Sequence, residues 1–141
     1  RLNQGQSALN QAYDVQKIAA QVGFDWDDLK PVLSKIEEEF EECREIIKFN
    51  SDNDRLDNKK LKIDSQGKLE GEIGDLLFAV VNLARFKGIN PEIALLKTIL
   101  KFKSRFEFIE KRVADKKTGF EDYTLKQLDA IWDEAKKEEK I

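Results

Sequence analysis

Hydrophobic residues recur at helical spacing along most of the chain. Between residues 31 and 49 they are separated by four, four, three and four positions, in the order Val32, Ile36, Phe40, Cys43 and Ile47. This spacing places them on one face of an amphipathic helix. Comparable patterns predict further helices over residues 7–23, 69–87, 90–114 and 124–136. The sequence therefore predicts an all-α helical bundle of about five helices, in which residues 1–141 form a single domain.

Capping residues mark several of the predicted helix ends. Asp25 is suited to cap the helix over residues 31–49, and the first turn of that helix accommodates Pro31. Asn90, followed by a proline, is suited to begin the helix over residues 90–114. Thr124 and Gln127, three residues apart, have the pattern of a capping box and predict the start of the last helix.

Residues 50–68 form a polar segment without helical periodicity. The segment reads NSDNDRLDNKKLKIDSQGK, and its short alternation at residues 61–63 is compatible with a fragment of strand. A connection of about 19 residues is long for a compact domain and is typical of functional or disordered loops. We therefore expect a long polar loop over residues 50–68, joining two helices that carry paired acidic residues.

Those acidic residues lie within apolar sequence. Glu72 and Asp75 are three residues apart on the helix over residues 69–87, so they project from one face, with Asn82 at a neighbouring angular position. The helix over residues 31–49 carries a matching pair, Glu39 and Glu42, inside or beside its apolar face. If the two apolar faces pack together, all four carboxylates share one cleft.

Four carboxylates in one cleft repel one another. At a separation of ~4 Å the repulsion is about 4 kcal/mol per pair at an effective dielectric constant near 20. Protonation, basic partners or hard divalent cations would relieve it, and oxygen ligands favour Mg²⁺ or Mn²⁺ over zinc. The spacing alone is equally compatible with a metal site and with a salt-bridged core network.

A row of basic residues lies on the helix predicted over residues 90–114. Lys97, Lys101 and Arg105 follow one another at intervals of four. Such a row is commonly a solvated edge. Beside metal-loaded carboxylates, however, lysine and arginine supply the point charge and the bidentate fork that bind polyphosphates. The acidic pairs and the basic row together suggest Mg²⁺-dependent phosphoryl or nucleotidyl chemistry.

Composition narrows the possible chemistry. The 141 residues include 25 Lys and Arg, 28 Asp and Glu, one Cys and no His. Without histidine, Ser-His-Asp triads, His-ligated zinc and Glu-x-x-His di-iron sites are excluded.

The near-balanced charge argues against a nucleic-acid partner, and no apolar run reaches the ~20 residues of a membrane helix. A single cysteine favours a reducing, cytoplasmic location. A chain that begins at Arg1 and lacks methionine is expected to be a fragment of a longer chain or a processed product.

Five segments occur in an order that resembles one enzyme family. They are VGFDW at 22–26, KIEEEFEE at 35–42, EGEIGDLLFAVVNLAR at 70–85, KFKSRF at 101–106 and IWDEAK at 131–136. Over residues 8–136 the chain resembles the MazG family of nucleoside triphosphate pyrophosphohydrolases, particularly its catalytic C-terminal domain. The resemblance implies an intertwined homodimer that uses Mg²⁺, or Mn²⁺ in its place. It also implies cleavage of a nucleoside triphosphate between the α and β phosphates, giving the monophosphate and pyrophosphate.

The matched positions imply a role for each candidate site residue. The implied Mg²⁺ ligands are Glu39, Glu42, Glu72 and Asp75. Glu38 resembles the carboxylate that orients or deprotonates the attacking water, the alternative being a plain surface glutamate. The implied substrate contacts are Lys35, Asn82, Lys101 and Arg105, together with Trp132 and Lys136 from a C-terminal motif that closes over the substrate. The alternatives for the last two are a core tryptophan and a solvated lysine. Phe24 and Trp26 are candidates for the nucleoside pocket, the alternative being aromatic residues buried as a loop anchor.

Two other functions remain compatible with the sequence. A catalytically silent helical scaffold would use the same carboxylates in ion pairs that fix the packing of a dimer. A narrower enzyme would hydrolyse only dUTP, dCTP or a phosphoribosyl nucleotide, because nothing in the sequence identifies the base.

Overall fold

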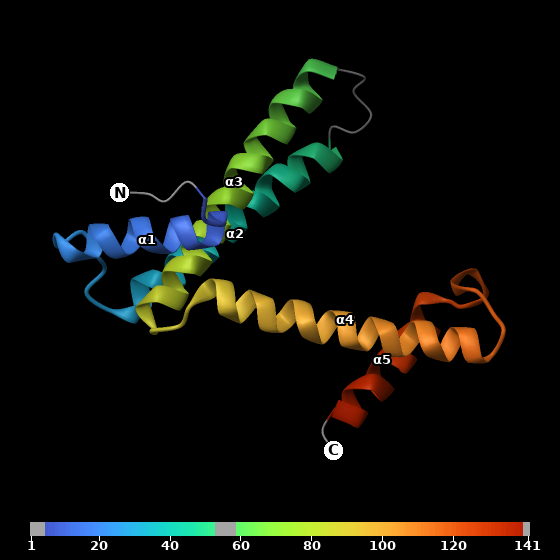
Figure 1. Ribbon diagram of the computed structural model, residues 1–141. Helices are drawn as coiled ribbons and strands as arrows, with labels where there is room; N and C mark the ends of the chain where they lie inside the picture. The colour runs from blue at the N-terminus through green and yellow to red at the C-terminus, as the bar shows by residue number, and fades with distance from the viewer. Residues whose placement is uncertain (1–4, 53–58, 140–141) are drawn as a thin grey trace. The chain divides into compact units, whose positions relative to one another are not determined.

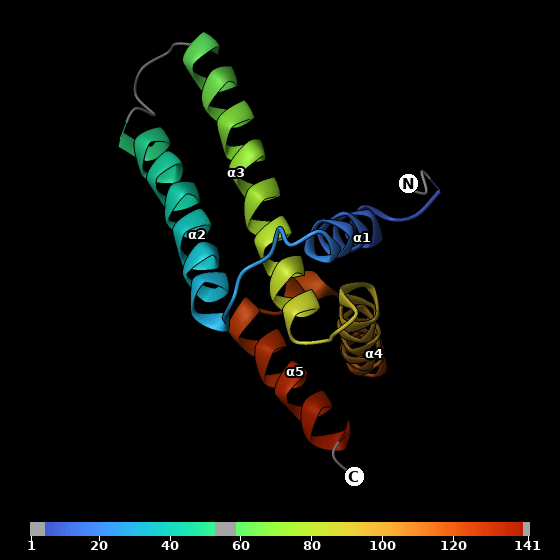
Figure 2. The ribbon, with the colours of Figure 1, turned by 90° about the vertical axis from the view of Figure 1, so that its left-hand side faces the viewer.

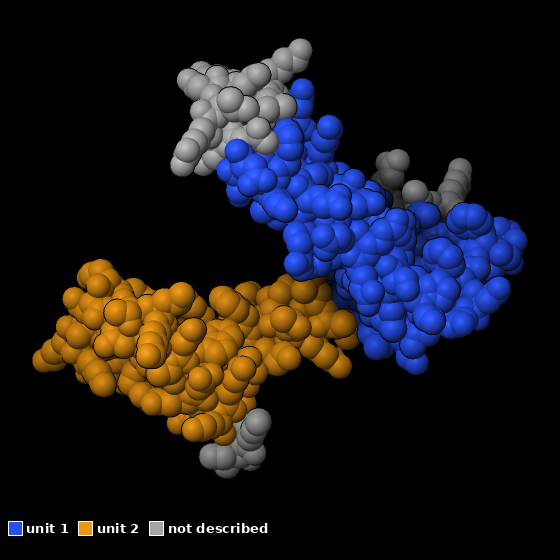
Figure 3. Space-filling model, turned by 180° about the vertical axis from the view of Figure 1, so that it is seen from behind, with its two compact units in different colours: residues 1–92 blue, residues 93–141 orange. Residues whose placement is uncertain are grey.

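The computed structural model describes residues 5–52 and 59–139. Within these residues the chain is all-α, with no strand, which confirms the predicted fold class. Contacts divide the chain into two compact units, residues 1–92 and residues 93–141, coloured separately in Figure 3. None of the helices in the described residues combines the length and hydropathy needed to cross a membrane.

The first unit contains three long helices. They are α1 (Ala8–Gln21), α2 (Leu29–Asp52) and α3 (Lys59–Phe86). Helices α2 and α3 run antiparallel side by side, and α1 packs against α3 (Figures 1 and 2). The buried apolar residues of this unit are Val32 and Cys43 on α2 and Ala79 and Val81 on α3. The packing of α2 on α3 brings together the two helices that carry the acidic pairs, as a shared site for the four carboxylates requires.

The second unit contains most of α4 (Pro91–Asp115), a short 3₁₀ helix η1 (Phe120–Asp122) and α5 (Leu125–Glu139). Ile109, Val113 and Ile131 form its buried core. Trp132 is partly buried and packs against this core. The unit therefore has its own small hydrophobic cluster at the junction of α4 and α5.

Two predicted helix starts are confirmed. Asn90 Oδ1 accepts a hydrogen bond from the Glu92 N–H at 2.9 Å at the start of α4. At the start of α5, Thr124 Oγ1 accepts from the Gln127 N–H at 3.1 Å, and Gln127 Oε1 accepts from the Thr124 N–H at 2.8 Å. This reciprocal pair is the capping box that the sequence predicts.

The predicted cap of α2 is wrong. Helix α2 begins at Leu29, where Asp28 Oδ1 accepts a hydrogen bond from the Lys30 N–H at 2.9 Å. Asp25 instead binds Arg85, 60 positions away in the sequence. Asp25 therefore forms a long-range ion pair and does not cap α2, although its spacing from the helix predicts a cap.

The predicted loop over residues 50–68 is also wrong over most of its length. Helix α2 continues to Asp52 and α3 begins at Lys59, so the proposed strand fragment lies in a helix; residues 53–58 lie outside the described residues. From residue 62 to residue 68 the helix is exposed except at Ser65, whose hydroxyl hydrogen-bonds Asn50 Oδ1 on α2. The buried contact of this segment is polar, so hydrophobic periodicity does not predict the helix here.

Candidate functional site

Three of the four predicted metal ligands meet between α2 and α3. Glu39, Glu72 and Asp75 each offer one carboxylate oxygen, and these oxygens all lie within 4.8 Å of one another. Glu39 is 5% exposed. Among the described residues, Glu39 Oε2 and Glu72 Oε2 are buried without a hydrogen-bond partner. The site therefore contains two buried carboxylate oxygens that no donor of the described residues contacts.

The fourth predicted ligand, Glu42, lies beside this group. A side-chain hydrogen bond with Glu72, followed by burial and the charges of Glu39 and Glu72, raises the pKa of Glu42 to about 7. A carboxylic acid that keeps its proton near neutral pH indicates that the neighbouring carboxylates repel a further charge. The repulsion expected between carboxylates that share one cleft is therefore present.

Lys35 compensates part of this charge. Its Nζ lies 2.9 Å from Glu39 Oε1 and 3.4 Å from Glu38 Oε2. The hydrogen bond from Lys35 is the main cause that holds the pKa of Glu39 below its ordinary value. Glu38 itself is exposed and lies outside the group of three oxygens. In the part of the chain that the structure describes, no Lys or Arg forms an ion pair with Glu42, Glu72 or Asp75.

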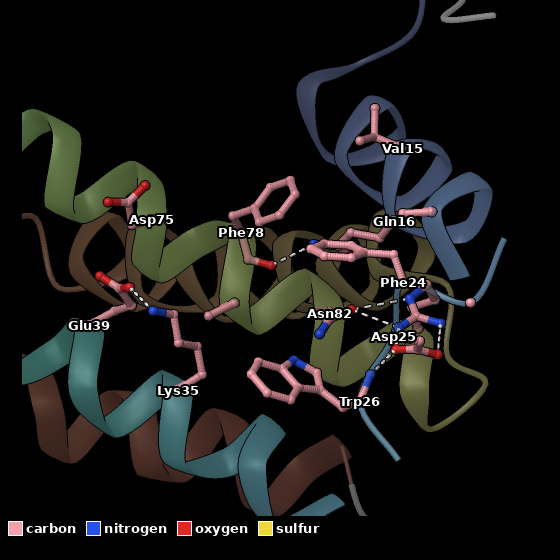
Figure 4. A pocket seen from close by; sticks show the side chains of 14 residues that line it. Val15, Gln16, Phe24, Asp25, Trp26, Lys35, Glu39, Asp75, Phe78 and Asn82 are labelled. Atoms are coloured by element: carbon pink, nitrogen blue, oxygen red, sulfur yellow. Dashed lines mark hydrogen bonds and ion pairs between the residues drawn. The ribbon is translucent and has the colours of Figure 1, made fainter. Parts of the chain in front are cut away.

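A cavity of about 670 Å³ opens beside the carboxylates. Glu39, Asp75 and Lys35 lie on one side of it, and Phe24 and Trp26 lie on the other (Figure 4). Phe24 is 82% exposed and Trp26 is 45% exposed. These aromatic residues are therefore not buried loop anchors; their side chains are open to the same cavity as the acidic residues.

A hydrogen-bond network that the sequence did not reveal fixes one wall of the cavity. Arg85 Nη2 lies 2.6 Å from Asp25 Oδ1. The same guanidinium donates to Asn82 Oδ1 from Nε at 3.1 Å and from Nη2 at 2.9 Å. Because arginine only donates, the oxygen of the Asn82 amide must face it, and the Asn82 NH₂ group is directed away from the guanidinium. Arg85 is part of the motif at 70–85, but its partner Asp25 could not be identified from spacing.

The remaining predicted substrate residues gather in the second unit. Arg105 donates to Glu139 from Nε, 3.1 Å from Oε1, and from Nη2, 3.0 Å from Oε2. Its guanidinium carbon lies 5.4 Å from the centre of the Trp132 ring. The hydrogen bonds from Arg105 are the main cause of the lowered pKa of Glu139, with smaller contributions from the charges of Lys101 and Lys136. The structure thus brings four predicted residues together around a carboxylate that the sequence analysis did not select.

Comparison with known proteins connects these features to one family. Residues 28–108 match the MazG nucleotide pyrophosphohydrolase domain. The chain is 39% identical over 132 residues, 94% of its length, to a nucleoside triphosphate pyrophosphohydrolase of Escherichia coli. It is 38% identical over 129 residues, 92% of its length, to the nucleoside triphosphate pyrophosphohydrolase/pyrophosphatase MazG of Thermotoga maritima. The chain spans about half the length of these curated relatives, 46% and 44% respectively. The matched domain covers more than half of the chain, which therefore belongs to the MazG nucleotide pyrophosphohydrolase domain family.

Proposed function

We propose that the chain hydrolyses nucleoside triphosphates to nucleoside monophosphates and pyrophosphate, using a divalent cation. The observation that carries the proposal is the group of oxygens from Glu39, Glu72 and Asp75 within 4.8 Å of one another. Membership of the MazG family and the names of the two relatives support the reaction class.

The proposed cofactor is Mg²⁺, with Mn²⁺ as a substitute, held by Glu39, Glu42, Glu72 and Asp75. The residues fit a hard cation because the donors are all carboxylate oxygens, and two of these oxygens are buried without a hydrogen-bond partner in the described part of the chain. When bound, Mg²⁺ supplies positive charge to the phosphate oxygens and lowers the pKa of the attacking water. The pKa of Glu42, raised to about 7, fits the same interpretation, since a cation would stabilise its charged form.

The remaining chemistry belongs to side chains of this protein. Water attacks the α-phosphorus in line, the bond to the bridging oxygen of the β-phosphate breaks, and pyrophosphate leaves. Glu38 accepts the proton of that water. Lys35, Lys101 and Arg105 neutralise the phosphate chain, while Trp132 and Lys136 close over it. In this mechanism the protein contributes mainly positioning and electrostatic stabilisation.

We further propose that both units belong to one domain and that two copies of the chain form a dimer. The matched region, residues 28–108, crosses the boundary between the units. Two apolar stripes are exposed in the first unit: Leu33, Phe40 and Ile47 at seven-residue intervals on α2, and Ile73, Leu77 and Val80 on α3. Exposed stripes of this kind are typical of protein interfaces. Sedimentation equilibrium tests the proposal, and a monomer at micromolar concentration would contradict it.

A metal-dependent product assay tests the reaction. Purified protein is incubated with each common nucleoside triphosphate in Mg²⁺ or in EDTA, and the products are separated by chromatography. Glu72→Gln should abolish formation of monophosphate and pyrophosphate, whereas Glu70→Gln, an exposed position on the same helix, should not. A folded protein with no Mg²⁺-dependent turnover of any triphosphate would favour the scaffold. Turnover of one nucleotide alone would favour a narrow-specificity enzyme.

A further inference from the structure

Gln16 is a buried polar residue on the wall of the cavity, away from the carboxylate group. It lies on α1, is 7% exposed, and lines the same 670 Å³ space as Phe24 and Trp26. In Figure 4 it lies on the side of Phe24 and Asn82, not on the side of Glu39 and Asp75. The mechanism proposed above gives it no role.

The orientation of the Gln16 amide follows from its hydrogen bond to Phe78. Nε2 donates to the backbone carbonyl of Phe78 at 2.9 Å. A carbonyl oxygen only accepts, so the NH₂ group of the amide must face it, and Oε1 must point elsewhere. Among the described residues, Oε1 is buried without a hydrogen-bond partner. Leaving a buried acceptor unpaired is costly, so a bound group that brings an N–H donor would be favoured at this position.

The place of Gln16 in the cavity indicates which part of a nucleotide it would contact. A polyphosphate that binds at Glu39 and Asp75 through cations leaves its nucleoside to extend toward Phe24 and Trp26. Aromatic side chains stack on planar bases whatever their hydrogen-bonding pattern, so Phe24 and Trp26 alone would not distinguish one base from another. The unpaired oxygen of Gln16 adds a directional acceptor. Asn82, whose amide oxygen is bound by Arg85, also lines the cavity and can offer its NH₂ group as a donor.

We propose, on the basis of the nucleotide hydrolysis proposed above, that Gln16 is a specificity-determining residue whose Oε1 accepts a hydrogen bond from the exocyclic amino group of adenine or cytosine. Binding of the correct base completes the hydrogen bonding of the buried amide. A base that presents no amino group at that position leaves the oxygen unpaired. The site therefore discriminates by the cost of an unsatisfied acceptor, which a purely apolar pocket does not impose.

Matched nucleotides that differ only in an amino group test this role. The two pairs are ATP with purine riboside triphosphate and CTP with its 4-deamino analogue. For the wild type we expect kcat/KM to be roughly ten-fold higher for the amino-bearing member of at least one pair, as one hydrogen bond would give. In Gln16→Met, which keeps the volume and removes both polar groups, this ratio should fall to near one. The change should come from a higher KM for the amino-bearing nucleotide, with little change in kcat.

Gln21→Met is the matched control, because Gln21 lies on the same helix, is exposed and does not line the cavity. It should keep the wild-type ratio, and thermal unfolding should show that both variants are folded. A wild-type ratio near one for both pairs would overturn the proposal whether or not Gln16→Met folds, and so would an unchanged ratio in folded Gln16→Met. These results differ from failure of the proposed function itself, in which the wild type would hydrolyse no nucleoside triphosphate in the Mg²⁺-dependent product assay.

Discussion

Arg105 and Glu139 form a two-point ion pair in the second unit. Both oxygens of the carboxylate are engaged, at 3.1 Å from Nε and at 3.0 Å from Nη2. This is the geometry with which arginine binds one face of a phosphate group. In the proposed function Arg105 binds the phosphate chain, so substrate and Glu139 would compete for the same guanidinium.

Glu139→Gln should therefore lower the KM for a nucleoside triphosphate. The variant removes the charge that competes with phosphate, and because the pair is close to solvent we expect only a roughly two- to five-fold effect, with kcat little changed. Steady-state kinetics at saturating Mg²⁺ measure it. Glu138→Gln makes the same charge change on the same helix and serves as the control. An equal decrease in KM for both variants would show that net charge, not release of Arg105, is responsible.

Asp75→Asn should separate catalysis from stability. Loss of one ligand charge should reduce turnover by at least ~100-fold at saturating Mg²⁺, since even residues that only support metal ligands affect activity by about 10–100-fold. In EDTA the same variant should melt at a higher temperature than the wild type, because it removes repulsion from Glu39 and Glu72. Product assays and thermal unfolding check the two effects. Near-wild-type turnover would show that Asp75 is not a ligand.

The raised pKa of Glu42 predicts a pH-dependent affinity for Mg²⁺. A ligand that is protonated below about pH 7 must release its proton when the cation binds, so affinity should increase between pH 6 and pH 8. For one proton the increase is at most about ten-fold per pH unit below the pKa. Calorimetric titrations of Mg²⁺ at several pH values measure it. Constant affinity across this range would contradict the proposed role of Glu42.

The raised pKa of Glu42 also predicts how the free energy of unfolding varies with pH when EDTA keeps the site free of cations. The folded-state pKa lies above the ordinary value of 4.5, so the stabilising contribution of protonated Glu42 is complete below pH 4.5 and is lost as pH rises through about 7. The free energy of unfolding should therefore decline between pH 5.5 and pH 8. In Glu42→Gln the decline should be smaller, whereas Glu37→Gln, on the exposed side of α2, should behave as the wild type does.

The features that the sequence predicted correctly depend on short separations along a helix. The i, i+3 spacing of Glu72 and Asp75 places both carboxylates on one face of α3, and the reciprocal cap of Thr124 and Gln127 also lies within one turn. The meeting of these carboxylates with Glu39 follows once the two amphipathic helices pack together. Local geometry together with hydrophobic patterning was sufficient for this part of the site.

The features that the sequence missed depend on contacts between distant residues. Asp25 and Arg85 are 60 positions apart, and the hydrogen bond of Gln16 to Phe78 spans 62 positions. The amino-terminal part of α3 was missed for a different reason, because its buried contact is the hydroxyl of Ser65, not an apolar side chain. Periodicity detects burial of apolar surface, so polar anchors of both kinds become visible only in the folded chain.

The Asp25–Arg85 pair gives a prediction in the acid range. Hydrogen bonding to Arg85 is the main cause that holds the pKa of Asp25 below its ordinary value of 3.8. The stabilisation is therefore present above pH 3.8 and is lost as pH falls through the lower pKa of the folded state. Asp25→Asn should lower the free energy of unfolding by about 1 kcal/mol at neutral pH, as expected for a partly exposed pair, and by much less near pH 2. Urea unfolding at both pH values measures the difference, with Asp27→Asn, an exposed carboxylate in the same loop, as the control. A difference that persists unchanged in acid would mean that Asp25 stabilises the loop through contacts that do not require its charge.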